Sequence, residues 1–342
     1  MKKICFFGGS VTEQTTGYAN CISINIINEY NVTILGFGSH GLNNAGILFI
    51  DDIVKQKPDL CVIQFFSNGS KQVIEDIDCI SVIANKLITI KCIPIFFFNL
   101  CRGSNYSGDE YISGIKNYLN DNGLLHIDMN DHIKPLCISS VAQSSLSSVE
   151  SSLNITSHQF DGVLNVKRCN VNSEYKWEHL IKDDVHTTDE GAKIYSDILT
   201  DFIKKTLDDA NYIFPTIKVR DTSLYNITTH SLNKTITKTL NIVFDENISS
   251  LYITLEVGHH SGIININGRE YNTWDKWCYF SRRRTFHFPL NDKNITIHLL
   301  SKSFDTSECK DKYINFVEQQ KQLCIKSISY SSNSTLQQID YI

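Results

Sequence analysis

The sequence predicts two domains of different class, an α/β domain followed by an antiparallel β domain. Over the first 210 residues, short apolar runs alternate five times with amphipathic stretches, whereas after Pro215 single apolar and polar residues alternate. The first pattern is typical of parallel strands in a three-layer α/β sandwich, and the second of antiparallel strands with one solvated face. The length of 342 residues also favours two domains. We expect them at 1–210 and 211–342, the second being β-sandwich-like.

The strands of the first domain are expected at five nearly continuous apolar runs, because strands covered on both faces lack alternation. These runs lie at 4–7, 32–35, 60–65, 94–98 and 124–128. Helices are expected near 15–29, 43–56, 71–91, 109–121 and 188–208. Residues 139–180 are rich in serine, interrupt this rhythm and are expected to form an insertion. Ligands bind at the carboxyl ends of parallel strands, so the residues that follow each strand are the candidates for a site.

Composition excludes several classes of protein. Apolar residues make up 42% of the chain and charged residues 20%, which excludes disordered and low-complexity chains. The net charge of −5 argues against a nucleic-acid partner. The eleven cysteines include no CxxC pair, so we expect free thiols rather than disulfides or a zinc site. The apolar run in "MKKICFFGGS" is too short for a signal peptide, and no run is long enough to span a membrane, so a cytoplasmic location is expected.

The first expected strand ends in Gly8-Gly9-Ser10, directly before a helix. Two glycines permit a tight turn that places Ser10 at the carboxyl edge of the sheet, with its N–H at a helix N-terminus where negative charge is stabilised. The alternative is that Ser10 is only an N-cap. The G-x-S-x-G turn of α/β-hydrolases is not matched, because Thr12 occupies the position of its second glycine.

A second candidate group is Asp183 and His186, three residues apart in a loop before the last expected helix. Thr187 and Glu190 are expected to form the capping box of that helix. A carboxylate and an imidazole at this spacing can form a hydrogen bond with each other. A serine needs a positioned imidazole as a base to become a nucleophile. A solvated Asp/His loop is the alternative. With Ser10, the chain order is Ser…Asp…His.

Taken together, these motifs resemble those of the SGNH (GDSL-type) hydrolases, a family that hydrolyses esters and thioesters. The four matching blocks appear in order over residues 1–208: "FFGGSVTEQ" with Ser10, "GFGSHGLNNAG" with Gly41, "QFFSNGS" with Asn68, and Asp183-x-x-His186. The resemblance implies a flavodoxin-like sandwich with a five-stranded parallel sheet.

The resemblance also implies a role for each matching residue. Ser10 is the implied nucleophile, His186 the general base and Asp183 the residue that orients it. The oxyanion hole is implied at the backbone N–H groups of Ser10 and Gly41 and the side-chain amide of Asn68. No metal or organic cofactor is implied.

The chain departs from the family pattern at two blocks. The usual aspartate before the serine is Gly9, and the third block has Phe66 and Gly69 in place of its glycine and aspartate. A divergent branch, a changed acyl acceptor and reduced activity are all compatible with these differences.

Other residues suggest competing or additional sites. Gly36, Gly38 and Gly41 match the dinucleotide pattern G-x-G-x-x-G, but they follow the second strand, whereas that fingerprint follows the first. Arg102 follows the fourth strand and could hold a substrate, or form a surface ion pair. Trp274 and Trp277 lie beside three arginines, which would suit a carbohydrate site, while packing in the β core is the alternative.

The sequence therefore predicts an esterase that removes a small acyl group, such as acetyl, from a small-molecule or glycan ester. The first alternative is an O-acyltransferase that uses the same residues and passes the acyl group to a sugar hydroxyl. An alternative of another class is a non-catalytic carbohydrate-binding or assembly protein. No nucleic acid is expected as a partner, and the oligomeric state is not predicted.

Overall fold

The computed structural model describes most of the chain, namely residues 1–38, 40–68, 72–101, 110–133, 175–224, 226–258, 260–274, 282–301, 321–331 and 334–341. The described chain divides into two compact units. The first comprises residues 1–38, 58–67 and 92–215, and the second comprises 39–57, 68–91 and 216–342.

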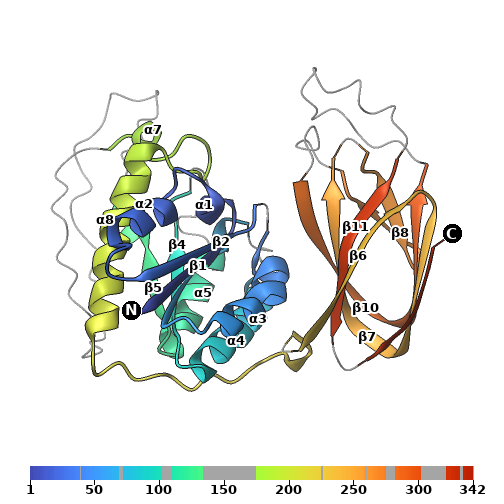
Figure 1. Ribbon diagram of the computed structural model, residues 1–342, viewed down its shortest axis with the longest axis horizontal. Helices are drawn as coiled ribbons and strands as arrows, with labels where there is room; N and C mark the ends of the chain where they lie inside the picture. Colours follow the sequence, from blue (N-terminus) through green and yellow to red (C-terminus); the bar gives the residue numbers. More distant parts are fainter. Residues whose placement is uncertain are drawn as a thin grey trace. The chain divides into compact units, whose positions relative to one another are not determined.

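The first unit is built on a five-stranded parallel sheet with the strand order β2-β1-β3-β4-β5 (Figure 1). Its strands are β1 (Lys3–Gly8), β2 (Asn31–Gly36), β3 (Leu60–Gln64), β4 (Ile93–Phe98) and β5 (Leu125–Asp128). Adjacent residues such as Phe6 and Phe7 are both fully buried, since both faces of the sheet are covered. This burial explains the continuous apolar runs and confirms the predicted α/β fold.

Helices α2 (Tyr18–Ile26) and α8 (Asp189–Asp208) pack against one face of this sheet. Ile22 of α2 and Leu199 of α8 join Phe6 and Val62 of the strands in one hydrophobic core. The unit also contains α1 (Ser10–Glu13), α5 (Glu110–Asp121), α6 (Met129–His132) and α7 (Trp177–Leu180). The first helix was expected near 15–29, and α2 begins after Gly17, its N-cap.

The capping residue of α8 differs from the prediction by one position. Thr188, not Thr187, is the N-cap, and its side-chain oxygen accepts a hydrogen bond from the N–H of Gly191 at 3.0 Å. Thr187 is fully buried and pairs with Ile181 in a β-bridge. The position of Thr187 is therefore determined by its burial inside the domain and not by capping of α8.

Cysteines in the described chain are free, as predicted. Cys5, Cys61 and Cys92 are all buried, and Cys5 and Cys61 are register partners on β1 and β3. Burial raises the pKa of the Cys61 thiol, as does its hydrogen bond with Cys5, and burial likewise raises the pKa of Cys92. The thiols of Cys61 and Cys92 therefore stay protonated at neutral pH.

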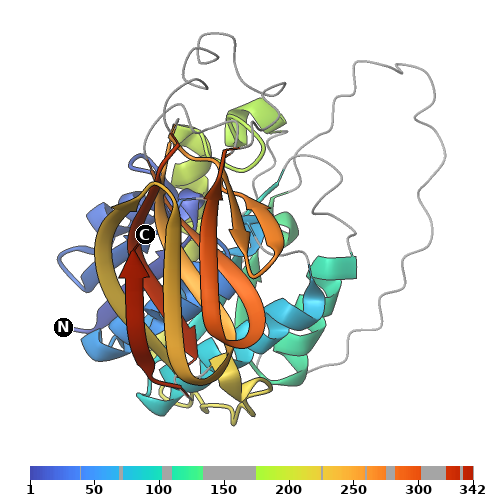
Figure 2. The ribbon, with the colours of Figure 1, turned by 90° about the vertical axis from the view of Figure 1, so that its right-hand side faces the viewer.

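The described residues of the second unit include the helices α3 (Ile47–Gln56) and α4 (Val73–Thr89), and the π-helix η1 (Leu42–Gly46) precedes α3. The 3₁₀-helix η2 (Phe66–Asn68) precedes α4 in the chain, with Phe66 and Ser67 in the first unit and Asn68 in the second. Lys86 of α4 donates to the Asp51 carboxylate of α3 at 2.7 Å. After η3 (Thr222–Leu224), the described part of this unit forms a seven-stranded sheet, which is easiest to follow in Figure 2.

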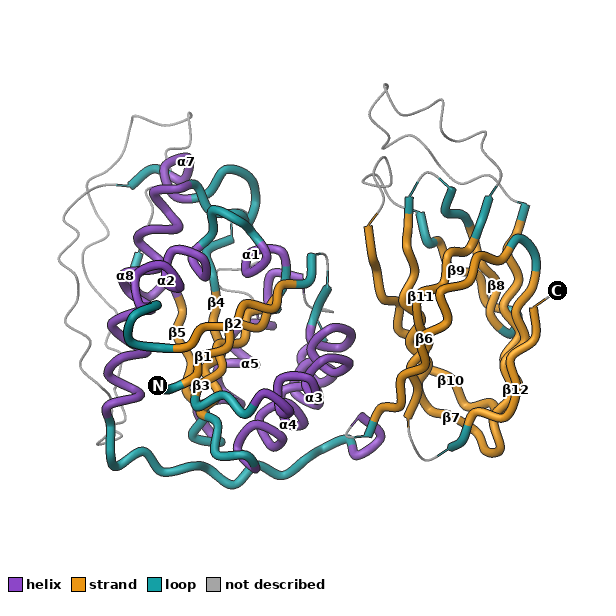
Figure 3. The backbone as a smooth tube through the Cα atoms, viewed as in Figure 1, coloured by secondary structure: helices purple, strands orange, loops and turns teal. Residues whose placement is uncertain are grey.

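This sheet is antiparallel, with the order β6-β11-β7-β10-β8-β9 and β12 added on β7. Its strands are β6 (Ile227–Ile236), β7 (Thr239–Val257), β8 (Ile263–Ile266), β9 (Arg269–Asn272), β10 (Arg282–Leu300), β11 (Leu323–Ser331) and β12 (Leu336–Tyr341), coloured orange in Figure 3. The pairing of β10 with β7 shifts register near Pro289 and Asp292, and β7 pairs with β11 and β12 along different halves. Residues from both halves of β7 belong to one hydrophobic core, so the predicted C-terminal β domain is confirmed.

No helix among the described residues is long and apolar enough to cross a membrane.

The packing of α8 against the sheet predicts how a core substitution changes the free energy of unfolding. Leu199→Ala should lower the free energy of unfolding by about 2–5 kcal/mol, because it opens a cavity between α8 and the sheet. Urea unfolding followed by circular dichroism measures the change. Asp197→Ala, at an exposed position on the same helix, is the control and should change the free energy by less than about 0.5 kcal/mol. Equal effects of the two substitutions would contradict the assignment of this core.

Candidate functional site

The turn that carries Ser10 is fixed by close packing at the end of β1. A Cβ atom on Gly8 would lie 2.2 Å from Thr12 Oγ1 and 2.4 Å from the Gln64 carbonyl oxygen, so only glycine fits. Gly9 is the N-cap of α1, and its N–H donates to the same carbonyl of Gln64 at 2.7 Å. Ser10 is the first residue of α1, so the alternative that Ser10 is an N-cap is wrong. The N–H of a first-turn residue has no acceptor within its helix.

The structure brings Ser10, His186 and Asp183 together in one hydrogen-bonded chain. Ser10 Oγ lies 2.8 Å from His186 Nε2, and His186 Nδ1 lies 2.8 Å from Asp183 Oδ2. An ionised carboxylate only accepts hydrogen bonds, so Nδ1 carries the proton of the neutral ring. Nε2 is then the acceptor that faces the Ser10 hydroxyl. Residues separated by 176 positions in the sequence thus meet in the geometry of a nucleophile and its base.

The Asp183 carboxylate is held by its own loop. Its Oδ1 atom accepts the backbone N–H groups of Val185 at 2.9 Å and His186 at 2.8 Å. Partial burial raises the pKa of Asp183, but these two hydrogen bonds and the contact with the His186 ring outweigh it, so the net pKa is lowered. Asp183 is therefore ionised at neutral pH and oriented toward Nδ1.

A buried polar network lies beneath the Ser10 turn and joins three strand ends. The side-chain oxygen of Gln64, at the end of β3, accepts from Thr12 Oγ1 at 3.2 Å. The Gln64 amide nitrogen donates to Ser67 at 3.0 Å and to the Asn99 side chain at 2.8 Å. Gln64, Thr12 and Asn99 are completely buried. Gln64 is not among the residues predicted from the sequence, although a polar residue within the apolar run "LCVIQFF" is a signal of such a role.

The implied oxyanion residues other than Ser10 follow β2 and β3. Gly41 precedes η1, and its N–H donates to the side-chain oxygen of Asn44 at 2.6 Å. This N–H is therefore already engaged. Asn68 is the last residue of η2, and its side chain lies outside the described atoms.

The glycines of the G-x-G-x-x-G match have a packing role. A Cβ atom on Gly36 would lie 2.4 Å from the Cα of Glu13, and one on Gly38 would lie 2.4 Å from the Glu13 carboxylate. The end of β2 therefore needs glycine at position 36 to pass beside the backbone of α1, whereas the Glu13 side chain can move aside for a Cβ atom on Gly38. This packing accounts for one of the three glycines without a dinucleotide.

The remaining candidates lie elsewhere or outside the described residues. Arg102 and Trp277 belong to ranges that the structure does not describe. Trp274 is half-buried against the core of the β domain, in line with the alternative weighed for it. Where the chain is described, no group of three or more His, Cys, Asp or Glu side chains is arranged to hold a metal.

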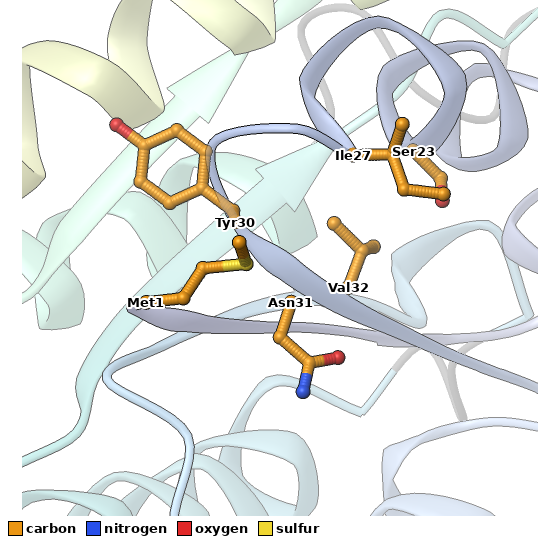
Figure 4. A pocket seen from close by; sticks show the side chains of 6 residues that line it. All are labelled: Met1, Ser23, Ile27, Tyr30, Asn31 and Val32. Atoms are coloured by element: carbon orange, nitrogen blue, oxygen red, sulfur yellow. The ribbon is translucent and has the colours of Figure 1, made fainter.

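A surface pocket of about 260 Å³ lies at the amino-terminal end of the parallel strands, opposite the end that carries Ser10 (Figure 4). Met1 precedes β1 and Asn31 begins β2, so the pocket is at the amino ends of these strands, whereas Ser10 follows the carboxyl end of β1. Its lining residues are Met1, Ser23, Ile27, Tyr30, Asn31 and Val32. None of them belongs to the hydrogen-bonded chain of Ser10.

Known structures share this architecture. The chain is similar to the crystal structure of a two-domain esterase active on acetylated mannans, with a TM-score of 0.65 over 96% of this chain and 91% of that one, at 11% identity. The chain has the SGNH-hydrolase fold. The same esterase co-crystallised with mannopentaose gives a TM-score of 0.63 and 12% identity over 96% and 90% of the two chains. Because the structural similarity covers 96% of this chain, it includes the C-terminal β domain as well as the α/β domain. Comparison of the sequence with protein-family models and with curated proteins found no match.

The lowered pKa of Asp183 makes a prediction about stability at acid pH. A carboxyl group with a depressed pKa in the folded protein stabilises it above the unfolded pKa of about 3.9, and this contribution is lost as the pH falls through the folded pKa. Wild type should therefore be more stable than Asp183→Asn at pH 5, and the difference should shrink between pH 4 and pH 2. Urea unfolding at each pH measures it.

The neighbouring exposed Asp184 provides the control for that experiment. Asp184→Asn removes a carboxylate from the same loop without touching His186, so its difference from wild type should stay small throughout. A difference for Asp183→Asn that is the same at pH 5 and pH 2 would contradict the prediction.

Proposed function

We propose that this protein is a serine-dependent carboxylic ester hydrolase that removes a small acyl group, in the first instance acetyl, from a carbohydrate. The observation that carries the proposal is the continuous hydrogen-bonded chain from Ser10 Oγ through His186 to Asp183, with both heavy-atom distances at 2.8 Å. A serine hydroxyl becomes a competent nucleophile when an imidazole within this distance accepts its proton. The SGNH-hydrolase fold supports the same assignment.

In the proposed first step, Ser10 Oγ attacks the ester carbonyl carbon and its proton moves to His186 Nε2. His186 then returns the proton to the leaving alcohol oxygen as the bond from carbon to that oxygen breaks, which leaves the acyl group on Ser10. A water molecule next gives a proton to His186 Nε2 and attacks the acyl carbon. The bond from that carbon to Ser10 Oγ then breaks, and His186 returns the proton to Ser10 Oγ, which releases the acid and restores the free serine. Asp183 remains ionised and stabilises the imidazolium that forms in each step.

Negative charge on the carbonyl oxygen needs hydrogen-bond donors. The N–H of Ser10 lies in the first turn of α1 and is proposed as one donor, and the Asn68 side-chain amide as another. The Gly41 N–H is proposed as the third. Since Asn44 accepts this N–H, the Asn44 side chain must release it before the oxyanion binds there.

The proposed substrate class rests on the two-domain neighbour. That esterase is active on acetylated mannans, and its likeness extends over 96% of this chain. An acetylated polysaccharide is therefore the first substrate to test. The β domain, Trp274 included, is the part of the chain that the proposed chemistry does not use.

Replacing the nucleophile tests the proposal directly. Ser10→Ala should reduce hydrolysis of p-nitrophenyl acetate and of acetylated mannan by at least about 1,000-fold, because the residue that carries the acyl group is lost. Colorimetric release of p-nitrophenol and of acetate measures the two rates. Ser113→Ala, which changes a serine on α5 bonded to the Glu110 carbonyl, should keep the wild-type rates.

The other outcomes of this experiment separate the competing functions. If wild type and Ser10→Ala are equally slow, the hydrolase is excluded, and glycan binding that survives Ser10→Ala would favour the non-catalytic alternative. If hydrolysis is weak but depends on Ser10, and added sugar acceptors speed release of the acyl group, the protein is an O-acyltransferase.

A second substitution tests the oxyanion hole. Asn68→Ala should lower kcat by about 100- to 1,000-fold and leave KM nearly unchanged, because the donor acts on charge that develops only in the transition state. Steady-state kinetics with p-nitrophenyl acetate give both constants. Asn122→Ala, which changes an amide bonded to the Tyr118 carbonyl, is the control and should behave as wild type. A full kcat for Asn68→Ala would remove Asn68 from the site.

A further inference from the structure

One side chain connects the segment that carries Ser10 to the loop that carries His186. The Gln14 amide nitrogen donates to the backbone oxygen of Thr187 at 2.7 Å. In return, the Thr187 hydroxyl donates to the Gln14 side-chain oxygen at 3.3 Å. The two residues are 173 positions apart, and Thr187 directly follows His186.

We infer that Gln14 is a positioning residue that fixes the separation between Ser10 and His186. The inference rests on the proposed function, because it assigns a role in aligning the nucleophile with its base. Gln14 is the last residue of the block "FFGGSVTEQ", but neither the family resemblance nor the proposed chemistry gives it a role.

Both ends of this connection are anchored. At one end, the backbone N–H of Gln14 donates to the Ser10 carbonyl at 3.0 Å, and the Gln14 carbonyl accepts the N–H of Gly17 at 2.9 Å. At the other end, Thr187 is completely buried and pairs with Ile181. Gln14 therefore joins the backbone of the nucleophile helix to a rigid point one residue from the base.

The catalytic pair needs such a support because its own hydrogen bond does not persist. In the proposed reaction, the proton leaves Ser10 Oγ and the bond to His186 Nε2 is broken and remade in every cycle. The Gln14 bonds take no part in proton transfer, so they hold the spacing throughout. Misplacement by about 1 Å costs on the order of 100-fold in rate.

The chemistry of the contact requires an amide. The Thr187 carbonyl needs a donor and the Thr187 hydroxyl uses an acceptor, and a glutamine side chain supplies both. Glutamate keeps the acceptor but sets a carboxylate oxygen against the carbonyl. Methionine has similar length and no charge but makes neither bond.

The experiment compares Gln14→Met and Gln14→Glu with wild type in the full chain. Both variants should lower kcat for p-nitrophenyl acetate by about 10- to 100-fold, with KM within about twofold of wild type. A fluorophosphonate probe gives a second readout, since Ser10 Oγ bonds to its phosphorus and fluoride leaves. The labelling rate should fall by the same factor as kcat, because the reaction needs the base but no glycan binding.

A matched control uses an amide elsewhere in the same unit. The Asn25 amide nitrogen on α2 donates to the Ser196 hydroxyl on α8 at 3.3 Å, which is also a side-chain bond between distant segments. Asn25→Asp changes amide to acid as Gln14→Glu does, but away from Ser10 and His186. It should keep the wild-type kcat and labelling rate, and thermal unfolding of each variant shows which molecules are folded.

The outcomes separate this inference from the proposed function. If wild type hydrolyses the ester and folded Gln14→Met is as fast, with equal labelling of Ser10, the inference is wrong and the proposed function stands. A parallel loss of kcat in Gln14→Met and Asn25→Asp would show a general effect on structure and also overturn it. If wild type itself neither hydrolyses the ester nor labels at Ser10, the proposed function fails and the inference fails with it.

Discussion

The site depends first on the buried amide of Gln64. A fully buried amide must have its hydrogen bonds satisfied, because leaving one of its groups unpaired costs about 1–3 kcal/mol. Gln64 meets this requirement with partners from three neighbouring segments, namely Thr12 after β1, Ser67 in its own turn and Asn99 after β4. Its backbone oxygen also accepts the N–H of Gly9. One residue therefore fixes the positions of three strand ends, and the Ser10 turn is built on this fixed base.

The loop of Asp183 and His186 has the opposite character. It lies largely at the surface, and the side chain of Asp183 is 50% exposed. Its order comes from short-range hydrogen bonds to the Asp183 carboxylate and from the buried Thr187 at its end. A rigid turn that carries Ser10 and a solvent-facing loop that carries His186 thus meet at one hydrogen bond, and the Gln14 side chain connects the same two segments.

The sequence was sufficient for the features that depend on local pattern. The five strands of the parallel sheet were predictable because burial on both faces leaves continuous apolar runs, and the order of the motif blocks placed Ser10, Asp183 and His186 at one edge. The roles of Gln14 and Gln64 were not predictable, since each is defined by partners that only the folded chain supplies. The cap of α8 was wrong by one residue for the same reason: Thr187 and Thr188 are equivalent in sequence, and burial of Thr187 distinguishes them. The engagement of the Gly41 N–H by Asn44 was equally invisible to the motif.

The buried thiols at the centre of the sheet have a consequence for how the protein can be studied. Cys5 and Cys61 are register partners inside the sandwich, their side chains have no access to solvent, and neither forms a disulfide. An alkylating reagent reaches such a sulfur only when the layers separate, which is a subglobal or global opening of the domain rather than a movement of one loop. Cys5 and Cys61 thus act as built-in reporters of opening, and the rate at which these two thiols are modified measures how often the interior of the first unit is exposed to water.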